Sequence, residues 1–311
     1  MFESDQPNQL HFRRFELESE FVKQLTRGDA LHFLSELPDE SVDLVVSSPP
    51  YFMGKEYDTS CSIDDFVLIH EQLSRQLVRI VKPGGSICWQ VGSHVRNNIV
   101  IPLDAVVYSV FSESNEIQLR NRIIWTFGHG AHCSRRFSGR HETVLWFTKG
   151  DNYYFELDAV RVPQKYPGKK HYKGPNRGLP SGNPLGKNPG DVWEIPNVKA
   201  GHVEKTGHPC QFPVALVQRL VKALTPTNGL VIDPYVGSGS SAIAALMEGR
   251  NFMGCDLEVR YLKIARDRIR KLQNGTLKCR ADEPIYIPSQ GDSVTKVPQQ
   301  WKPYLESKLI V

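Results

Sequence analysis

The chain has 311 residues, of which 40% are hydrophobic and 23% are charged, and its formal net charge is +4. This composition excludes a mainly disordered chain. The small positive excess is not by itself evidence of nucleic-acid binding. The length suits one large α/β domain with an insertion, or two domains.

The six cysteines contain no C-x-x-C pair, which argues against a zinc site and against a disulfide framework. We expect free thiols and no metal, as in a reducing cytosol. The first twenty residues are polar and mixed in charge, and no stretch reaches the apolar length of a membrane span. These features predict a soluble, cytoplasmic protein without a membrane partner.

In the first half of the chain, helical and extended patterns alternate. The Gly28-Asp29 turn predicts a short helix with Asp29 as its N-cap. The other elements are expected at the following places: strand 42–47, helix 63–81, a turn at Lys82-Pro83-Gly84-Gly85, strand 86–91, helix 105–111, and strands 122–127 and 143–148.

The expected strand 42–47 ends in the sequence S-S-P-P-Y, residues 47–51. Two successive prolines cannot continue a strand, because proline has no N–H group to donate to the ladder. The strand therefore ends in a serine, two proline carbonyls and an aromatic ring. Such a tip is either a rigid turn with an aromatic lid or a pocket that grips a flat polar group.

The stretch from Arg161 to Cys210 differs from its surroundings. It contains nine Lys or Arg against three Asp or Glu, and sixteen Gly or Pro. A flexible linker is one interpretation. However, Tyr166, Tyr172 and Trp193 lie among the basic residues, and this mixture is typical of contacts with phosphates and bases. We therefore favour contact with DNA or RNA.

Regular patterns return after this stretch, and we expect helix 212–224, strand 230–233, helix 241–248, strand 252–256 and helix 258–272. The alternation of strands and helices predicts an α/β fold with a doubly wound, mostly parallel sheet.

The turn D-P-Y-V-G-S-G-S-S after strand 230–233 is rich in glycine, which lets a backbone approach a ligand closely. The N-terminus of the helix that follows attracts anions. Asp256, at the end of the next strand, can accept both hydroxyls of a ribose. The turn formally fits a dinucleotide pattern, but its place near the C-terminus favours S-adenosylmethionine (SAM) over NAD.

Two stretches taken together, VDLVVSSPPY and VIDPYVGSGSSAIAALMEGRNFMGCD, resemble the beta-class DNA amino-methyltransferases of restriction–modification systems. In that class the catalytic motif comes first, a basic target-recognition segment second and the SAM motif last. The resemblance runs from about Gly28 to Ile269 and is weakest between Arg161 and Thr206. One departure is Tyr235, where many relatives have phenylalanine.

The resemblance implies a Rossmann-like SAM-dependent methyltransferase fold with a basic insertion. Its expected parts are an N-terminal extension (1–27), a catalytic half (28–160), the recognition segment (161–206), a SAM-binding half (207–273) and a C-terminal tail (274–311).

The resemblance also implies roles for individual residues. The catalytic residues would be Ser48, Pro49, Pro50 and Tyr51. The SAM-binding residues would be Asp29, Phe212, Pro213, Asp233, Pro234, Gly237, Gly239, Ser240, Ser241 and Asp256. The alternatives are that Asp29 only caps a helix and that Phe212 is only a core residue. Separately, Arg135, Arg136 and Arg140 form either a solvated basic turn or a set of phosphate clamps, and we favour the clamps because the stretch precedes the recognition segment. The other DNA-binding residues expected, all from the basic segment, are Lys169, Lys170, Lys173 and Arg177.

In this family S-P-P-Y is associated mainly with N4-cytosine and D-P-P-Y mainly with N6-adenine. We therefore expect methylation of the cytosine N4 amine in double-stranded DNA by base flipping, with N6-adenine as the alternative. The expected partner is double-stranded DNA, with a cognate restriction endonuclease acting separately. Methylation of RNA or protein amines, an NAD-dependent oxidoreductase and a binding module without catalysis are the competing hypotheses.

Overall fold

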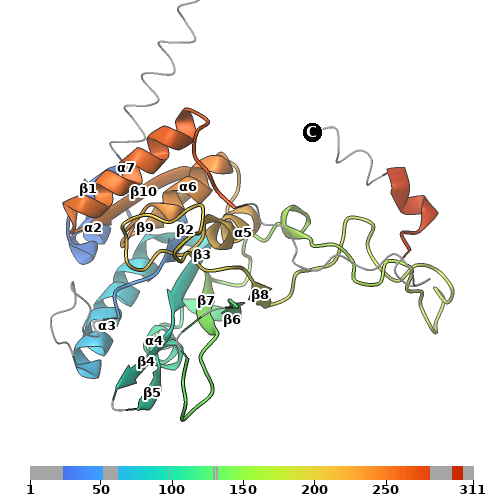
Figure 1. Ribbon diagram of the computed structural model, residues 1–311, viewed down its shortest axis with the longest axis horizontal. Helices are drawn as coiled ribbons and strands as arrows, with labels where there is room; N and C mark the ends of the chain where they lie inside the picture. Colours follow the sequence, from blue (N-terminus) through green and yellow to red (C-terminus); the bar gives the residue numbers. More distant parts are fainter. Residues whose placement is uncertain are drawn as a thin grey trace, which may run out of the picture.

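The structure is a computed structural model that describes residues 24–51, 62–96, 98–128, 130, 132–280 and 296–303. A twisted eight-stranded sheet forms its centre, with strand order β1-β10-β9-β2-β3-β7-β6-β8 (Figure 1). The strands are β1 (Leu25–Arg27), β2 (Val42–Ser47), β3 (Val81–Val91), β6 (Ile117–Thr126), β7 (His141–Lys149), β8 (Val192–Glu194), β9 (Leu230–Asp233) and β10 (Asn251–Asp256).

Helices cover both faces of this sheet and enclose two hydrophobic cores. Leu44 and Val46 of β2 belong to one core and Val45 to the other, because successive side chains of a strand point to opposite faces. The first core lies under α5 (Val214–Leu224), α6 (Ser240–Met247) and α7 (Val259–Gln273). The second lies under α2 (Ala30–Ser35), α3 (Ile63–Ile80) and α4 (Leu103–Phe111).

The five strands β1, β10, β9, β2 and β3 are parallel, so their carboxyl ends meet at one edge of the sheet. We call this the carboxyl edge. β7 runs antiparallel to β3 and pairs Thr143 with Val91, so the beginning of β7 lies at the same edge. The tip after β2, the glycine turn after β9 and the end of β10 are thereby brought together.

The predicted α/β class and mostly parallel sheet are confirmed, with shifted boundaries. The Lys82–Gly85 stretch was wrongly predicted as a turn and is the irregular first part of β3. Gly84 has φ 80°, and the register with β2 shifts between Val42 and Leu44. α5 begins at Val214 and not at Phe212, because the residue before a proline avoids the helical region.

Four short strands were not predicted. β1 and β8 have three residues each and lie at the two ends of the sheet order. β4 (Ser93–Arg96) and β5 (Ile99–Pro102) form a separate two-stranded sheet. Strands this short carry too few residues for a period of two to be recognised. Within the described residues, no helix has both the length and the apolar character that crossing a membrane requires.

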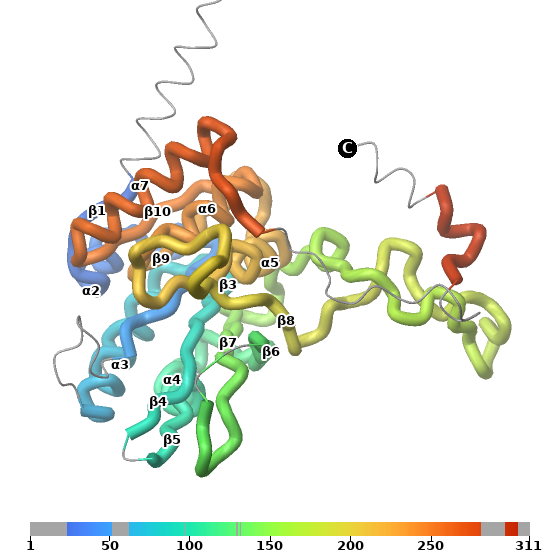
Figure 2. Tube along the Cα trace, viewed as in Figure 1, coloured from blue at the N-terminus to red at the C-terminus, as the bar shows by residue number. Residues whose placement is uncertain are grey.

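Residues 161–190, which we call the arm, extend away from the sheet and contain few regular elements (Figure 2). Backbone turns and two isolated bridges hold the arm, Val162 with Lys187 and Lys170 with Pro180. Trp301, in the short 3₁₀ helix Gln299–Trp301, packs against it. Its side chain is buried, and a Cβ atom on Gly182 would lie 3.0 Å from its Cη2. The C-terminal tail, predicted as a separate part, therefore contributes to the arm.

Candidate active site

The two serines of the S-S-P-P-Y tip have different environments. Ser47 is completely buried at the end of β2, and its hydroxyl donates a hydrogen bond to Asp233 Oδ1 at 2.6 Å. Ser48 is half-buried, between Ser47 and the buried Pro49. The first serine therefore joins β2 to the glycine turn, and the second lies where a ligand can reach it.

Tyr51 is held at its hydroxyl end by a buried amide. Gln90 of β3 donates from Nε2 to the Tyr51 hydroxyl at 3.2 Å and to Glu142 Oε2 of β7 at 2.5 Å. Burial, and then the negative charge of Glu142, raise the pKa of Tyr51 well above its usual range, so the phenol stays neutral. The sequence analysis missed Gln90 and Glu142, although a glutamine in the apolar run I-C-W-Q-V was a signal.

Asp233 links the catalytic tip to the glycine turn. Its carboxylate is completely buried and accepts hydrogen bonds from the hydroxyls of Ser47 and Ser241 and from the N–H group of Tyr235. Burial raises the pKa of Asp233 to about 6, although these three hydrogen bonds act in the opposite direction. One carboxylate thus fixes β2, β9 and α6 relative to one another.

The two glycines of the turn are required by conformation and by packing. Gly237 has φ 48°, and a Cβ atom there would lie 2.8 Å from Nε2 of His208. Gly239 has φ 79°, and a Cβ atom there would lie 2.8 Å from Cβ of Ala265. Gly239 is the N-cap of α6, and no side chain caps this helix. The backbone N–H groups of its first turn are therefore the donors that the turn offers to an anion.

The hydroxyls of Ser240 and Ser241 are engaged within the protein. The Ser241 hydroxyl donates to Asp233, and the Ser240 hydroxyl accepts from Arg268 Nη1 at 3.0 Å. Both serines are buried. An anion at the start of α6 would accordingly meet backbone N–H groups rather than these hydroxyls.

Three carboxylates gather at the carboxyl edge. Asp256 accepts hydrogen bonds from the N–H groups of Gly237 at 2.9 Å and Glu258 at 2.8 Å, and it is half-buried. Asp29 caps α2, as predicted, by accepting from the N–H groups of Leu31 and His32. Burial raises the pKa of the Cys255 thiol, and the charges of Asp233, Asp256 and Asp29 add to this shift. The edge thus suits a cationic ligand.

The segment before α5 is fixed by a buried ion pair that the sequence analysis missed. Glu204 is 3% exposed, accepts from the N–H group of Val214 at 2.9 Å and lies 3.8 Å from Arg268 Nη2. Pro213 is the N-cap of α5, and Phe212 is half-buried against the core. Phe212 and Pro213 therefore lie at the start of α5, and Phe212 packs against the hydrophobic core that also contains Val236 of the glycine turn.

The predicted DNA-binding residues fall into two groups. Arg135, Arg136 and Arg140 belong to the loop between β6 and β7, and the first two are exposed. The other group is in the arm, where four of the cations are the predicted residues, all exposed: Lys169, Lys170, Lys173 and Arg177. The two groups project from the sheet in different directions (Figure 2).

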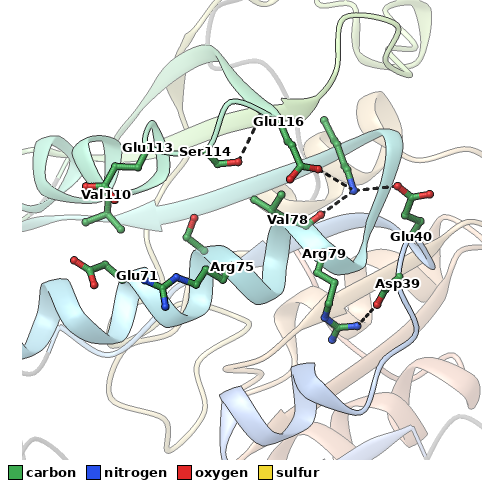
Figure 3. Close-up of a pocket in the computed structure, with 12 residues that line it drawn as sticks. Asp39, Glu40, Glu71, Arg75, Val78, Arg79, Val110, Glu113, Ser114 and Glu116 are labelled. Carbon is green, nitrogen blue, oxygen red and sulfur yellow. Dashed lines mark hydrogen bonds and ion pairs between the residues drawn. The ribbon is translucent and has the colours of Figure 1, made fainter.

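A hollow of about 710 Å³ lies elsewhere, beside α3 (Figure 3). Several of its charged side chains form ion pairs, with Arg79 2.5 Å from Asp39 and Lys149 3.2 Å from Glu40. Asp39 precedes β2 and Lys149 ends β7, so this hollow lies at the edge opposite the carboxyl edge. It contains none of the predicted site residues.

The chain is similar to known proteins over most of its length. Residues 42–267 match the model of the N6/N4 DNA methylase family. The chain is 45% identical over 252 residues to the type II methyltransferase M.BglII of Bacillus subtilis, covering 79% of this chain and 70% of the relative. It is 36% identical over 253 residues to M.ScaI of Streptomyces caespitosus, covering 79% and 80% of the two chains.

Solved structures share the fold. The PvuII DNA methyltransferase (cytosine-N4-specific) superimposes with a TM-score of 0.61 at 19% identity, over 81% of this chain and 92% of that one. A putative DNA modification methylase of Thermus thermophilus, solved with SAM, superimposes with a TM-score of 0.58 at 25% identity, over 80% and 93%. The chain therefore belongs to the N6/N4 DNA methylase family, as the order of its two motifs predicted, and has the methyltransferase fold.

Proposed function

We propose that this protein methylates the N4 amine of cytosine at specific sites in double-stranded DNA, as the modification enzyme of a restriction–modification system. The observation that carries the choice of base is Ser48, a half-buried neutral side chain at the position where adenine-associated motifs have aspartate. The names of similar proteins do not decide which base is methylated. The PvuII enzyme is named cytosine-N4-specific, whereas a 29% identical Escherichia coli relative is named DNA adenine methyltransferase YhdJ.

The proposed chemistry begins with the amine. Its lone pair is delocalised into the ring, so the protein must hold the two amine hydrogens in a way that localises the lone pair. The Ser48 hydroxyl and the Pro49 carbonyl are acceptors on a backbone restrained by two prolines. Tyr51, held through Gln90 and Glu142, offers a fixed aromatic face against which the base can stack. Alignment of this kind supplies much of the acceleration.

S-adenosylmethionine is the cofactor, and it supplies an electrophilic methyl group on a sulfonium. Asp256 would bind the ribose hydroxyls, because its carboxylate is oriented by two N–H groups and keeps further acceptor capacity. The N–H groups of Ser240 and Ser241 would receive the methionine carboxylate beside the close-packed turn of Gly237 and Gly239.

The remaining cofactor residues surround this turn. Asp29 would contact the adenine end, and Phe212 and Pro213 would flank the methionine portion. Asp233 and Pro234 would shape the turn. The three carboxylates at the carboxyl edge favour the positive sulfonium.

Double-stranded DNA is the proposed substrate. The arginines of the β6–β7 loop and the cations of the arm would contact its phosphates. The target base must leave the duplex to reach Ser48, so the proposal includes base flipping.

The test is to incubate the protein with methyl-labelled SAM and unmethylated bacterial DNA, digest the DNA to nucleosides and identify labelled species by mass. A Ser48→Ala variant serves as the control. Labelled N4-methylcytosine from the wild type alone is the expected result. Labelled N6-methyladenine would contradict the choice of base, and no labelled nucleoside would contradict DNA as the substrate.

A further inference from the structure

The loop between β6 and β7, residues 127–140, carries an aromatic side chain that none of these roles uses. Phe137 is 100% exposed, the highest value among the large apolar side chains that the structure describes. A single exposed apolar residue is ordinary on a protein surface. Phe137 differs from the other exposed apolar side chains in two ways: its loop is attached close to the catalytic tip, and arginines flank it in the sequence.

The loop is attached next to the catalytic tip. Thr126 pairs with His141 at its base, and the N–H group of Phe127 donates to the carbonyl of Arg140 at 3.0 Å. Glu142 follows His141 in β7, and its carboxylate accepts a hydrogen bond from the Gln90 amide that also holds Tyr51. Glu142 follows Phe137 by five positions, a reach of at most about 18 Å along the chain. Figure 1 shows the loop in green, projecting beyond the end of β6 and the beginning of β7.

A side-chain hydrogen bond closes the tip of the loop, and the phenyl ring lies outside it. The Ser138 hydroxyl accepts a hydrogen bond from the N–H group of Cys133 at 3.0 Å, which closes a turn around residues 134–137. The exposed Arg135 and Arg136 precede Phe137, and Arg140 follows it. In contact with DNA, an aromatic ring in this position can stack on bases while the guanidinium groups on either side of it bind phosphates.

We propose that Phe137 is a wedge that enters the base stack of the DNA where the target base has left it. Extruding a base costs the stacking and pairing of that base. An inserted ring replaces part of the lost stacking and delays the return of the base. The flanking arginines would hold the backbone while the target lies against Ser48 and Tyr51. This inference rests on the proposed methylation of duplex DNA.

The test compares two duplexes that contain the recognition sequence, located beforehand by sequencing methylated DNA. In one the target base is paired, and in the other it faces an abasic site, which removes the cost of unpairing. Single-turnover methyl transfer is measured at saturating DNA. For Phe137→Ala we expect a loss of about 10- to 100-fold on the paired duplex and less than about threefold on the abasic duplex.

Two further variants serve as controls. Phe137→Trp keeps an aromatic wedge and should retain most of the activity on the paired duplex. Leu68→Ala removes an exposed apolar side chain of α3 and should leave both rates unchanged. Because the Phe137 ring is fully exposed, Phe137→Ala should also keep the thermal unfolding midpoint of the wild type.

An equal loss on the two duplexes would overturn the wedge, since the ring would then act on the flipped base or on the loop itself. An unchanged rate on the paired duplex would also overturn it. A wild-type protein that methylates neither duplex would contradict the proposed function, and the wedge with it, so the two failures are distinguishable.

Discussion

The carboxyl edge and the arm are built in opposite ways. At the edge, polar side chains are buried and hydrogen-bonded to one another, as in Ser47, Asp233 and Ser241. In the arm, turns and backbone hydrogen bonds hold the chain, while the four predicted DNA-binding cations and Tyr172 are exposed, the tyrosine to 90%. The edge specifies one geometry for a reaction, whereas the arm presents side chains that can change without disturbing the core.

This difference predicts that substitutions at the edge alter chemistry or stability and that substitutions in the arm alter DNA affinity alone. The largest expected effect is at the catalytic tip. Ser48→Ala removes one acceptor for the target amine and should lower the single-turnover rate by about 100- to 1000-fold. Affinity for SAM, measured by calorimetry, should not change, because Ser48 is not part of the glycine turn.

The neighbouring serine is the matched control for this variant. Ser47→Ala leaves Asp233 with one fewer donor and should lower the free energy of unfolding. A Ser48→Ala variant with the wild-type rate would remove the proposed role of the tip and would weaken the contrast between edge and arm.

The second prediction concerns the pH dependence of stability. The pKa of Asp233 is about 6 in the folded protein and 3.8 in a model compound, so the folded state binds the proton more tightly. The stability that this proton contributes is present below pH 4 and is lost as pH rises to about 6. The wild-type free energy of unfolding, minus that of Asp233→Asn, should decrease by about 2–3 kcal/mol over this interval.

Urea unfolding at several pH values measures that difference, and subtraction of the variant cancels the other carboxyl groups. A difference that is constant between pH 4 and pH 6.5 would show that the Asp233 pKa is not raised. A Tyr235→Phe variant, which keeps the backbone donor to Asp233, should follow the wild type.

The third prediction tests the arm. Replacing four of its exposed cations, Lys169, Lys170, Lys173 and Arg177, with alanine should weaken DNA binding by about 30- to 100-fold and reduce the salt slope by about 3–4. SAM affinity and the unfolding midpoint should stay unchanged, because these side chains are exposed. Fluorescence anisotropy with a labelled duplex at several salt concentrations measures both quantities.

A control of similar charge is available on α7, where Lys263, Arg270 and Lys271 are exposed. Alanine at these three positions should change the salt slope little. Equal slopes for the two variants would mean that DNA responds to the net charge of the protein and not to the arm.

The smallest expected effect is at Asp256. Asp256→Asn keeps one acceptor but replaces the other with a donor that faces an N–H group, either that of Gly237 or that of Glu258. Affinity for SAM should fall by about 10- to 30-fold, as measured by calorimetry. Glu258→Gln changes the charge of the adjacent exposed residue and should have less effect. Equal losses for both variants would indicate a general charge effect.

Much of the fold followed from local patterns in the sequence. The apolar run 42–47, the Asp29 cap and the glycine turn each depend on neighbouring residues, and each was found where predicted. Local patterns did not separate Ser47 from Ser48, because the direction of each side chain depends on how β2 packs against β9. They also did not pair Gln90 with Glu142, which lie 52 positions apart and meet only through the β3–β7 register.

The contact between Trp301 and Gly182 has a consequence for exchanging recognition specificity between relatives. Trp301 is buried against a segment that lies more than a hundred positions earlier in the chain. A chimaera that receives only residues 161–190 from a relative would combine a foreign arm with the resident tryptophan. If the arm has the proposed recognition role, a specificity exchange therefore requires the coding segments of the arm and of the tail around Trp301 to be transferred together.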